Sequence, residues 1–263
     1  PRSTLFPCTT VFRSQNVVST NIDGKKVVLD ANNDITIKGS NIHATDNIIA
    51  TTKEGDINVV AATYKEGELH QVNKKGTFGL SRSMNLKSVD SQKLYESLLK
   101  TDTANIVLNS GKDINIIASN VDSASDVQLK AFDGLNVLAG EELSSSTNKH
   151  ESSRLNLLNL FIGVATAGLV PTGSVYTQTI KEKGNYDTDA KSSNIKAGGN
   201  IVADTGTTNI VGSNLEAGKN IVISADTGGI NITTAQELTN AHDREKKIDV
   251  KLSSIFDMEQ SAS

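Results

Sequence analysis

The side chains that could perform catalysis are few and scattered along this chain of 263 residues. Acid–base cleavage of a polysaccharide requires carboxylates or basic groups clustered on one surface. Asp204 and Asp226 could approach each other if the chain folds as a repeat, but we expect no lysine, arginine or histidine in register with them. The histidines lie far apart in the sequence, at His43, His70, His150 and His242. This favours a non-enzymatic role, and a carbohydrate-active lyase or hydrolase is the alternative.

Motifs that hold metals or cofactors are missing from the sequence. Gly198-Gly199 and Gly228-Gly229 lack the following aspartate of the calcium-binding nonapeptide. There is no glycine-rich phosphate loop, zinc-ligand spacing or nucleophile elbow. We therefore predict no catalytic residue, no metal and no cofactor.

The amino-acid composition is typical of an all-β protein, so strands and turns must position any functional site. Aromatic residues make up 4% of the chain, and isoleucine, valine, threonine, asparagine and 20 glycines are prominent. Isoleucine, valine and threonine favour strands, whereas asparagine and glycine favour tight turns. The formal net charge is −4, with 26 lysines and arginines and no long basic run. Nucleic-acid binding is therefore not expected.

Apolar residues recur with a period of 20 residues, which is the main signal in the sequence. This length fits one rung of a parallel β-solenoid, in which short strands alternate with turns and each rung stacks on the previous one. Stacked rungs would join equivalent residues into a structural ladder. The predicted ladder pairs are Ile22 with Ile42, Val28 with Ile48, Ile37 with Ile57, Ile195 with Leu215, Ile201 with Ile221, and Ile210 with Ile230.

Asparagines precede many of the residues that we expect to point inward. Asparagine tolerates left-handed backbone angles, and stacked asparagines can form hydrogen-bonded ladders. We interpret them as structural; a binding row is the alternative. They are Asn21, Asn41, Asn120, Asn194, Asn200, Asn209, Asn214 and Asn220.

Less regular segments divide the repeat into blocks. We predict solenoid rungs over residues 15–62, 104–139 and 192–235. Interruptions fill the remainder, at 63–103 and 140–191, and a third begins at 236–263. They read as hairpins or extra rungs that project from one face of the solenoid.

Two parts of these interruptions leave alternatives open. Residues 155–170 are apolar and punctuated by glycine, and they read as a strand pair packed on the solenoid or as an exposed contact surface for a membrane or partner. Residues 90–101 could form a short amphipathic helix or the returning arm of a hairpin, and we favour the hairpin.

Both ends suggest a fragment. Residues 1–14, which include the only cysteine, Cys8, resemble the translation of a library scar, with a short native strand as the alternative. The last residues show no capping element. We therefore interpret the chain as an internal piece of a longer protein.

Two long segments carry a family resemblance. They are GKDINIIASNVDSASDVQLKAFDGLNVLAGEELSSSTNKHESSR (111–154) and NIKAGGNIVADTGTTNIVGSNLEAGKNIVISADTGGINITTAQE (194–237). They resemble the hemagglutinin repeats of filamentous hemagglutinin-type exoproteins, and KKGTFGL (74–80) is similar to the inter-repeat linker of that family. The resemblance covers nearly all of residues 16–263.

The resemblance implies a right-handed parallel β-helix that is secreted to the cell surface of a Gram-negative bacterium. Its partners would be the outer-membrane transporter of a two-partner secretion system and the surface of a target or host cell, with the target outer membrane as a further candidate. Such proteins are adhesins or contact-dependent growth inhibition toxins. The expected function is therefore a stem for adhesion or for presenting a C-terminal toxin.

Overall fold

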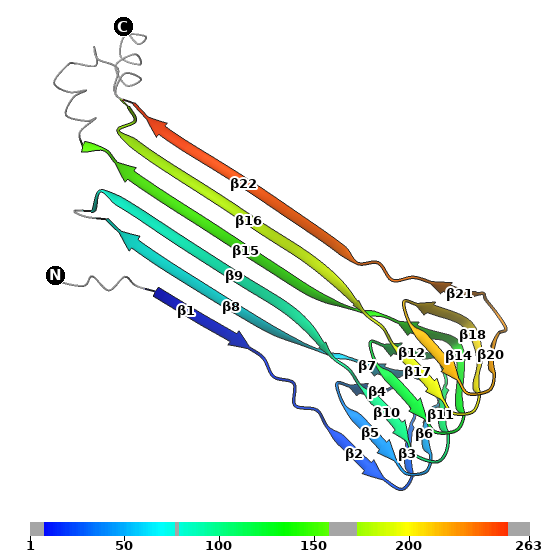
Figure 1. The fold of residues 1–263 in the computed structure, drawn as a ribbon. Helices are drawn as coiled ribbons and strands as arrows, with labels where there is room; N and C mark the ends of the chain where they lie inside the picture. Colours follow the sequence, from blue (N-terminus) through cyan, green and yellow to red (C-terminus); the bar gives the residue numbers. More distant parts are fainter. Residues whose placement is uncertain (1–7, 77–78, 158–172, 252–263) are drawn as a thin grey trace.

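The computed structural model describes residues 8–76, 79–157 and 173–251, which form a solenoid and a long antiparallel sheet that projects from it (Figure 1). Parallel strands of the solenoid stack into a β-helix, which confirms the predicted fold class. Within the described residues, no helix is long and apolar enough to cross a bilayer.

Each solenoid rung contributes three strand segments. The first segments form one six-stranded parallel sheet: β2 (Asn21–Gly24), β5 (Asn41–Ala44), β10 (Leu98–Thr101), β13 (Asn120–Ser123), β17 (Asn194–Ala197) and β19 (Asn214–Ala217). The second segments are β3 (Val27–Ala31), β6 (Ile48–Thr52), β11 (Ile106–Ser110), β14 (Val127–Leu138), β18 (Ile201–Val211) and β20 (Ile221–Ala225). The third segments are β4 (Ile35–Lys38), β7 (Ile57–Val60), β12 (Asp113–Ile117) and β21 (Ile230–Thr233), together with the second halves of β14 and β18.

The core lies inside the solenoid and consists of aliphatic residues that alternate with outward polar ones. β6 and β7 show this alternation clearly, because every second residue is buried. The central rungs bury their inward side chains completely, as at Ile106, Ile114 and Leu135. One rung could not bury such a face alone, so neighbouring rungs are required for stability.

The projecting sheet contains six antiparallel strands in the order β1-β8-β9-β15-β16-β22 (Figure 1). Their bounds are β1 (Cys8–Ser14), β8 (Ala62–Lys75), β9 (Ser81–Tyr95), β15 (Gly140–Leu155), β16 (Tyr176–Lys191) and β22 (Leu238–Val250). β8 with β9 and β15 with β16 are two hairpins, and their neighbouring arms also pair with each other. The interruptions are therefore joined into one sheet.

Several expectations about these segments can now be placed. Residues 90–101 form the end of β9 and then β10, so they adopt the strand conformation that we favoured over the helix. β10 already belongs to the solenoid, six residues before the boundary expected at 104. Residues 8–14 form β1 and pair with β8, so they are part of the described sheet; their origin as a library scar stays a prediction. Most of residues 155–170 lie outside the described residues.

Candidate functional site

The predicted ladder residues lie on the stacked rungs, and three of the six pairs are direct register partners. These are Ile22 with Ile42, Ile195 with Leu215, and Ile201 with Ile221. Each pair joins neighbouring parallel strands whose turns have equal length, so a constant spacing of 20 residues places them correctly.

The other three pairs are corrected by the strand register. Ile48 lies beside Val27 instead of Val28, which points outward and is 56% exposed. The preceding turn has one residue fewer in the first rung than in the second, and a slip of one residue reverses the face of a strand. The next turn is also one residue shorter in the first rung than in the second. Ile35, not Ile37, therefore lies beside Ile57.

The same effect separates the last predicted pair. Ile230 lies beside Thr208, and Ile210 lies beside Ile232. The register differs from the predicted one by two residues. Because side chains alternate between the two faces of a strand, Ile210 and Ile230 still lie on the same face. The true rung length therefore varies between 20 and 22 residues.

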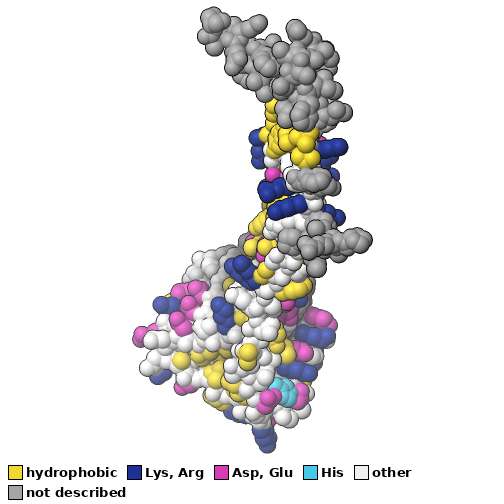
Figure 2. All heavy atoms as spheres, turned by 90° about the vertical axis from the view of Figure 1, so that its left-hand side faces the viewer, with side chains coloured by type: hydrophobic (Ala, Val, Ile, Leu, Met, Phe, Trp, Pro, Cys, Tyr) yellow, Lys and Arg dark blue, Asp and Glu magenta, His cyan; other side chains and the backbone are white. Residues whose placement is uncertain are grey.

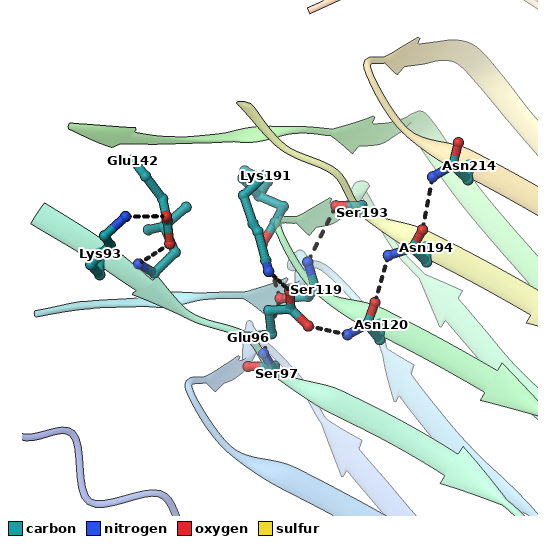
Figure 3. A network of polar contacts seen from close by, with 12 residues as sticks. Lys93, Glu96, Ser97, Ser119, Asn120, Glu142, Lys191, Ser193, Asn194 and Asn214 are labelled. Atoms are coloured by element: carbon teal, nitrogen blue, oxygen red, sulfur yellow. Dashed lines mark hydrogen bonds and ion pairs between the residues drawn. The ribbon is translucent and has the colours of Figure 1, made fainter. Parts of the chain in front are cut away.

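Asparagine ladders run along the outside of the rungs, as predicted. The bond lengths from Nδ2 to Oδ1 are 2.9 Å for Asn41–Asn21, Asn194–Asn120 and Asn214–Asn194, 3.0 Å for Asn209–Asn136, and 3.1 Å for Asn220–Asn200. One of these ladders runs along the first strand segments of the rungs, and there Leu98 occupies the position that asparagine has in the neighbouring rungs. Asn120 there donates to the Glu96 carboxylate, which also forms an ion pair of 2.8 Å with Lys191 (Figure 3). A charged side chain from the base of a hairpin thus replaces the missing amide.

The sequence did not lead us to predict a serine ladder, which runs along the corner before the first strands of all described rungs except the first, where Thr20 takes this position. The Ser97 amide donates to Ser119 Oγ, and the Ser119 amide donates to Ser193 Oγ, each at 3.3 Å. Ser119 Oγ in turn donates to the Ile117 carbonyl at 3.0 Å. These serines are fully buried. The recurrence of serine directly before the first strand of five of the six rungs was the signal that could have revealed them.

Hairpins leave the solenoid at this corner after every second rung. The chain runs directly through the corner at Gly39, Ala118 and Gly212, which all have positive φ. At the alternate corners it departs into β8, β15 and β22. Two rungs advance the solenoid by about 9.6 Å, and two antiparallel strands advance a sheet by the same amount. The two sheets therefore grow in step, and two rungs with one hairpin form the structural unit.

Asp204 and Asp226, the candidate acid–base pair, are not register partners. Asp204 lies beside Ser224 and Lys130, whereas Asp226 lies in the following turn. The expectation that no lysine is in register with Asp204 was wrong, because Lys130 sits on the neighbouring strand. A hollow of about 760 Å³ beside β1 contains Glu66 and Asp90. Glu66 is the register partner of Ser91, so Asp90 points to the other face of the sheet.

Stacked aspartates at another turn have a capping role. Asp34 Oδ1 accepts the Asp56 amide at 2.9 Å, and Asp56 Oδ1 accepts the Asp113 amide at 3.2 Å. Burial, with Asp56 and Asp133 nearby, raises the pKa of Asp113. Within the described ranges, no group of histidine, cysteine and acidic side chains is arranged to hold a metal ion.

His43 is the one histidine of the solenoid, and it connects three rungs. Its Nε2 lies 2.9 Å from Asp102 Oδ2, and its Nδ1 lies 3.3 Å from Asp23 Oδ1. The hydrogen bond to Asp102, supported by Asp23, raises the pKa of His43 above its usual value. The other three histidines lie on β8, β15 and β22 of the projecting sheet.

Comparison with known families agrees with this architecture. The sequence matches the hemagglutinin repeat over residues 9–93 and 79–245, which together span most of the chain. The chain belongs to the hemagglutinin repeat family. No curated protein and no solved structure matches it.

Membership of the hemagglutinin repeat family changes how the interruptions are understood. Each match includes both solenoid rungs and strands of the projecting sheet, so the hairpins belong to the hemagglutinin repeat itself. The first match begins within β1. The family supports a stem of a filamentous hemagglutinin-like adhesin at a bacterial surface, and its structural character favours a non-enzymatic role.

Proposed function

We propose that this chain is a non-enzymatic stem segment of a large secreted exoprotein at the surface of a Gram-negative bacterium. The stem holds an adhesive tip, or a C-terminal toxin, away from the producing cell. An outer-membrane transporter of the two-partner secretion type exports it, and a target or host cell, including its outer membrane, is the surface that it reaches. Family membership supports this proposal.

The observation that carries the proposal is the unit of two rungs and one hairpin. Every unit repeats both sheets in the same direction, so length is added without closing the structure. In a solenoid, each repeat contacts only its neighbours, and folding can propagate from one end. Such propagation would draw the emerging chain outward through a pore. A rod that lengthens by about 9.6 Å per unit is suited to reach.

A deletion of one whole unit tests this role. Removal of residues 97–192 from the exoprotein joins Glu96 to Ser193, so Ser193 replaces Ser97 at the corner. Rung register and strand pairing then continue across the junction. We expect normal secretion, protease resistance and a rod that is shorter by about 9.6 Å in electron micrographs.

The matched control removes residues 97–118, which is a single rung, and joins Glu96 to Ser119. The two hairpins would then be separated by one rung while still requiring the width of two strands. We expect impaired secretion and rapid proteolysis. Equal secretion and protease resistance of the two deletions would contradict the proposal. Loss of neighbour killing with intact attachment would identify a toxin stem, and loss of attachment alone would identify an adhesin.

A further inference from the structure

The projecting sheet and the solenoid have different spacings where they join. Figure 2 shows the sheet as a narrow arm above the broad solenoid. The two arms of one hairpin stay paired down to the corner, where the last pairs are Ala62 with Tyr95 and Gly140 with Lys191. Neighbouring arms of different hairpins meet the solenoid two rungs apart, about 9.6 Å, although they lie about 4.8 Å apart in the sheet. These arms must therefore diverge toward the solenoid.

The strand register shows where this divergence begins. β9 and β15 pair as far as Gln92 with Leu143, and β16 and β22 pair as far as Thr188 with Leu238. In the described part of the chain, neither register continues from these pairs toward the solenoid. We call these two points the forks. They are equivalent positions in successive units, so any feature that both forks share belongs to the repeating unit.

A glutamate side chain bridges each fork. Glu142 Oε1 accepts a hydrogen bond from the Leu94 amide at 2.9 Å (Figure 3). Glu237 Oε1 accepts one from the Ala190 amide at 3.3 Å. Each amide lies two residues beyond the last paired residue of its own strand, where the next ladder bond of an antiparallel pair would have formed. Each glutamate directly precedes the last paired leucine on the other strand. A carboxylate thus reaches across a gap that is too wide for the backbone.

The fork between β9 and β15 is the better shielded of the two. Lys93 Nζ lies 3.0 Å from Glu142 Oε2, and the Glu142 side chain is 18% exposed. Burial by itself would raise the pKa of Glu142, but the Leu94 amide and the Lys93 ammonium bring this pKa below its usual value. The carboxylate therefore stays charged, and a charged acceptor forms a stronger hydrogen bond than a neutral one.

The backbone at the junction offers places at which the sheet could turn. Where the chain crosses between the sheet and the solenoid, one or two residues belong to no strand, at 61, 96–97, 139 and 192–193. Short breaks at the ends of elements are the positions that absorb changes of backbone angle in hinges. Contacts across the forks would oppose such a rotation, because they join arms that enter the solenoid at different rungs.

We propose that Glu142 and Glu237 hold the forks closed and thereby fix the angle of the projecting sheet on the solenoid. Without these two glutamates, the sheet pivots at the strand breaks while the rungs remain stacked. The stem and its arm are thus one rigid body because of two side chains, and this role is separate from the reach that the rungs provide.

Spin labels on the sheet and on the solenoid test the proposal in the complete chain. In a Cys8→Ser background, Lys87→Cys and Lys130→Cys place labels at exposed positions of the two parts, and double electron–electron resonance measures the distribution of distances between them. Glu142→Ala/Glu237→Ala should broaden this distribution. Hydrogen exchange of the Leu94 and Ala190 amides should become at least about tenfold faster, because each loses a charged acceptor.

The matched control is Glu151→Ala/Glu245→Ala, which removes the same residue type and charge from the same two strands. These glutamates contact the side chains of Gln178 and Lys181 within the sheet, away from the forks. We expect neither a broader distribution nor faster exchange of the two fork amides in this control.

A milder variant, Glu142→Gln/Glu237→Gln, keeps an uncharged acceptor at each fork and should give an intermediate effect. Circular dichroism verifies that the strands of each variant are intact. The proposal would be overturned by an unchanged distance distribution in both fork variants, by equal broadening in the control, or by exchange in β13 that rises as much as at the forks. The last result would mean that the whole stem had loosened.

Discussion

One ladder offers a direct comparison of the same substitution in the middle and at the end of the stack. Ile57, Ile114, Leu135, Thr208 and Ile230 are successive register partners. Ile114 has neighbours on both sides and is fully buried, whereas Ile230 has one neighbour and is 48% exposed. If stacking stabilises the rod, truncation to alanine must cost much more at Ile114.

The expected magnitudes follow from the burial. Replacing isoleucine by alanine removes three carbon atoms, each of which contributes about 0.8 kcal/mol when buried. Ile114→Ala should therefore cost about 2.4 kcal/mol from transfer, and roughly 3–4 kcal/mol with the enclosed cavity. Ile230→Ala should cost about 1 kcal/mol, because half of the side chain is already in water and no closed cavity forms.

Native-state hydrogen exchange, read by mass spectrometry at β7, β12 and β14 for Ile114→Ala and at β18 and β21 for Ile230→Ala, measures these differences rung by rung. This local assay is preferable because solenoids need not unfold in one step. A gap of about 2 kcal/mol corresponds to a roughly 30-fold difference in the local opening constant. Equal effects of the two substitutions on their own rungs would refute the reasoning that neighbouring rungs supply the burial.

Three further changes test the corner, the turn and the charge cluster. Ser119→Ala should cost about 1–3 kcal/mol and speed hydrogen exchange of the Ser97 amide, because that buried donor loses its acceptor; unchanged exchange would contradict the ladder. Gly39→Ala should lower stability to urea by at least about 1 kcal/mol, since φ is +53° and the added carbon would lie 2.5 Å from a neighbouring Cβ; a neutral effect would exclude this corner conformation. The raised pKa of His43 means that its charged contacts with Asp102 stabilise the fold below pH 6.5, and that this stabilisation is lost as pH rises through the folded-state pKa. His43→Gln should thus be more destabilising at pH 5 than at pH 9, and an NMR titration midpoint at or below 6.5 would refute the pairing.

The solenoid was predictable because its signal is local and repeated. Ile195 and Leu215 follow turns of equal length, so periodicity alone places them side by side. The prediction for Val28 was wrong because the turn before it is one residue shorter than the equivalent turn of the next rung. A shift of one residue in a strand moves each side chain to the opposite face. The asparagine ladders were predictable because asparagine recurs at equivalent positions of neighbouring rungs, where its side chains bond to one another.

The projecting sheet was only partly predictable. Hairpins could be inferred from the interruptions, but the pairing between β9 and β15 joins two interruptions across two complete rungs. That pairing is possible because two stacked rungs and two paired strands span the same distance, and this distance cannot be read from the sequence. The closeness of Lys87 and Lys183, which lie on the two sides of Asn148, was hidden for the same reason, because it depends on this pairing.

The central claim is that the rungs stack continuously past each inserted hairpin, and an engineered disulfide tests it most directly. Asp122 and Lys196 are register partners on the outer surface of β13 and β17, although the whole of β14, β15 and β16 lies between them in the sequence. In a Cys8→Ser background, Asp122→Cys/Lys196→Cys should oxidise readily, since neighbouring strands match disulfide geometry. Asp122→Cys/Ala197→Cys should not, because Ala197 is buried and faces the interior. Failure of the first pair, or equal oxidation of both, would contradict the continuous stem.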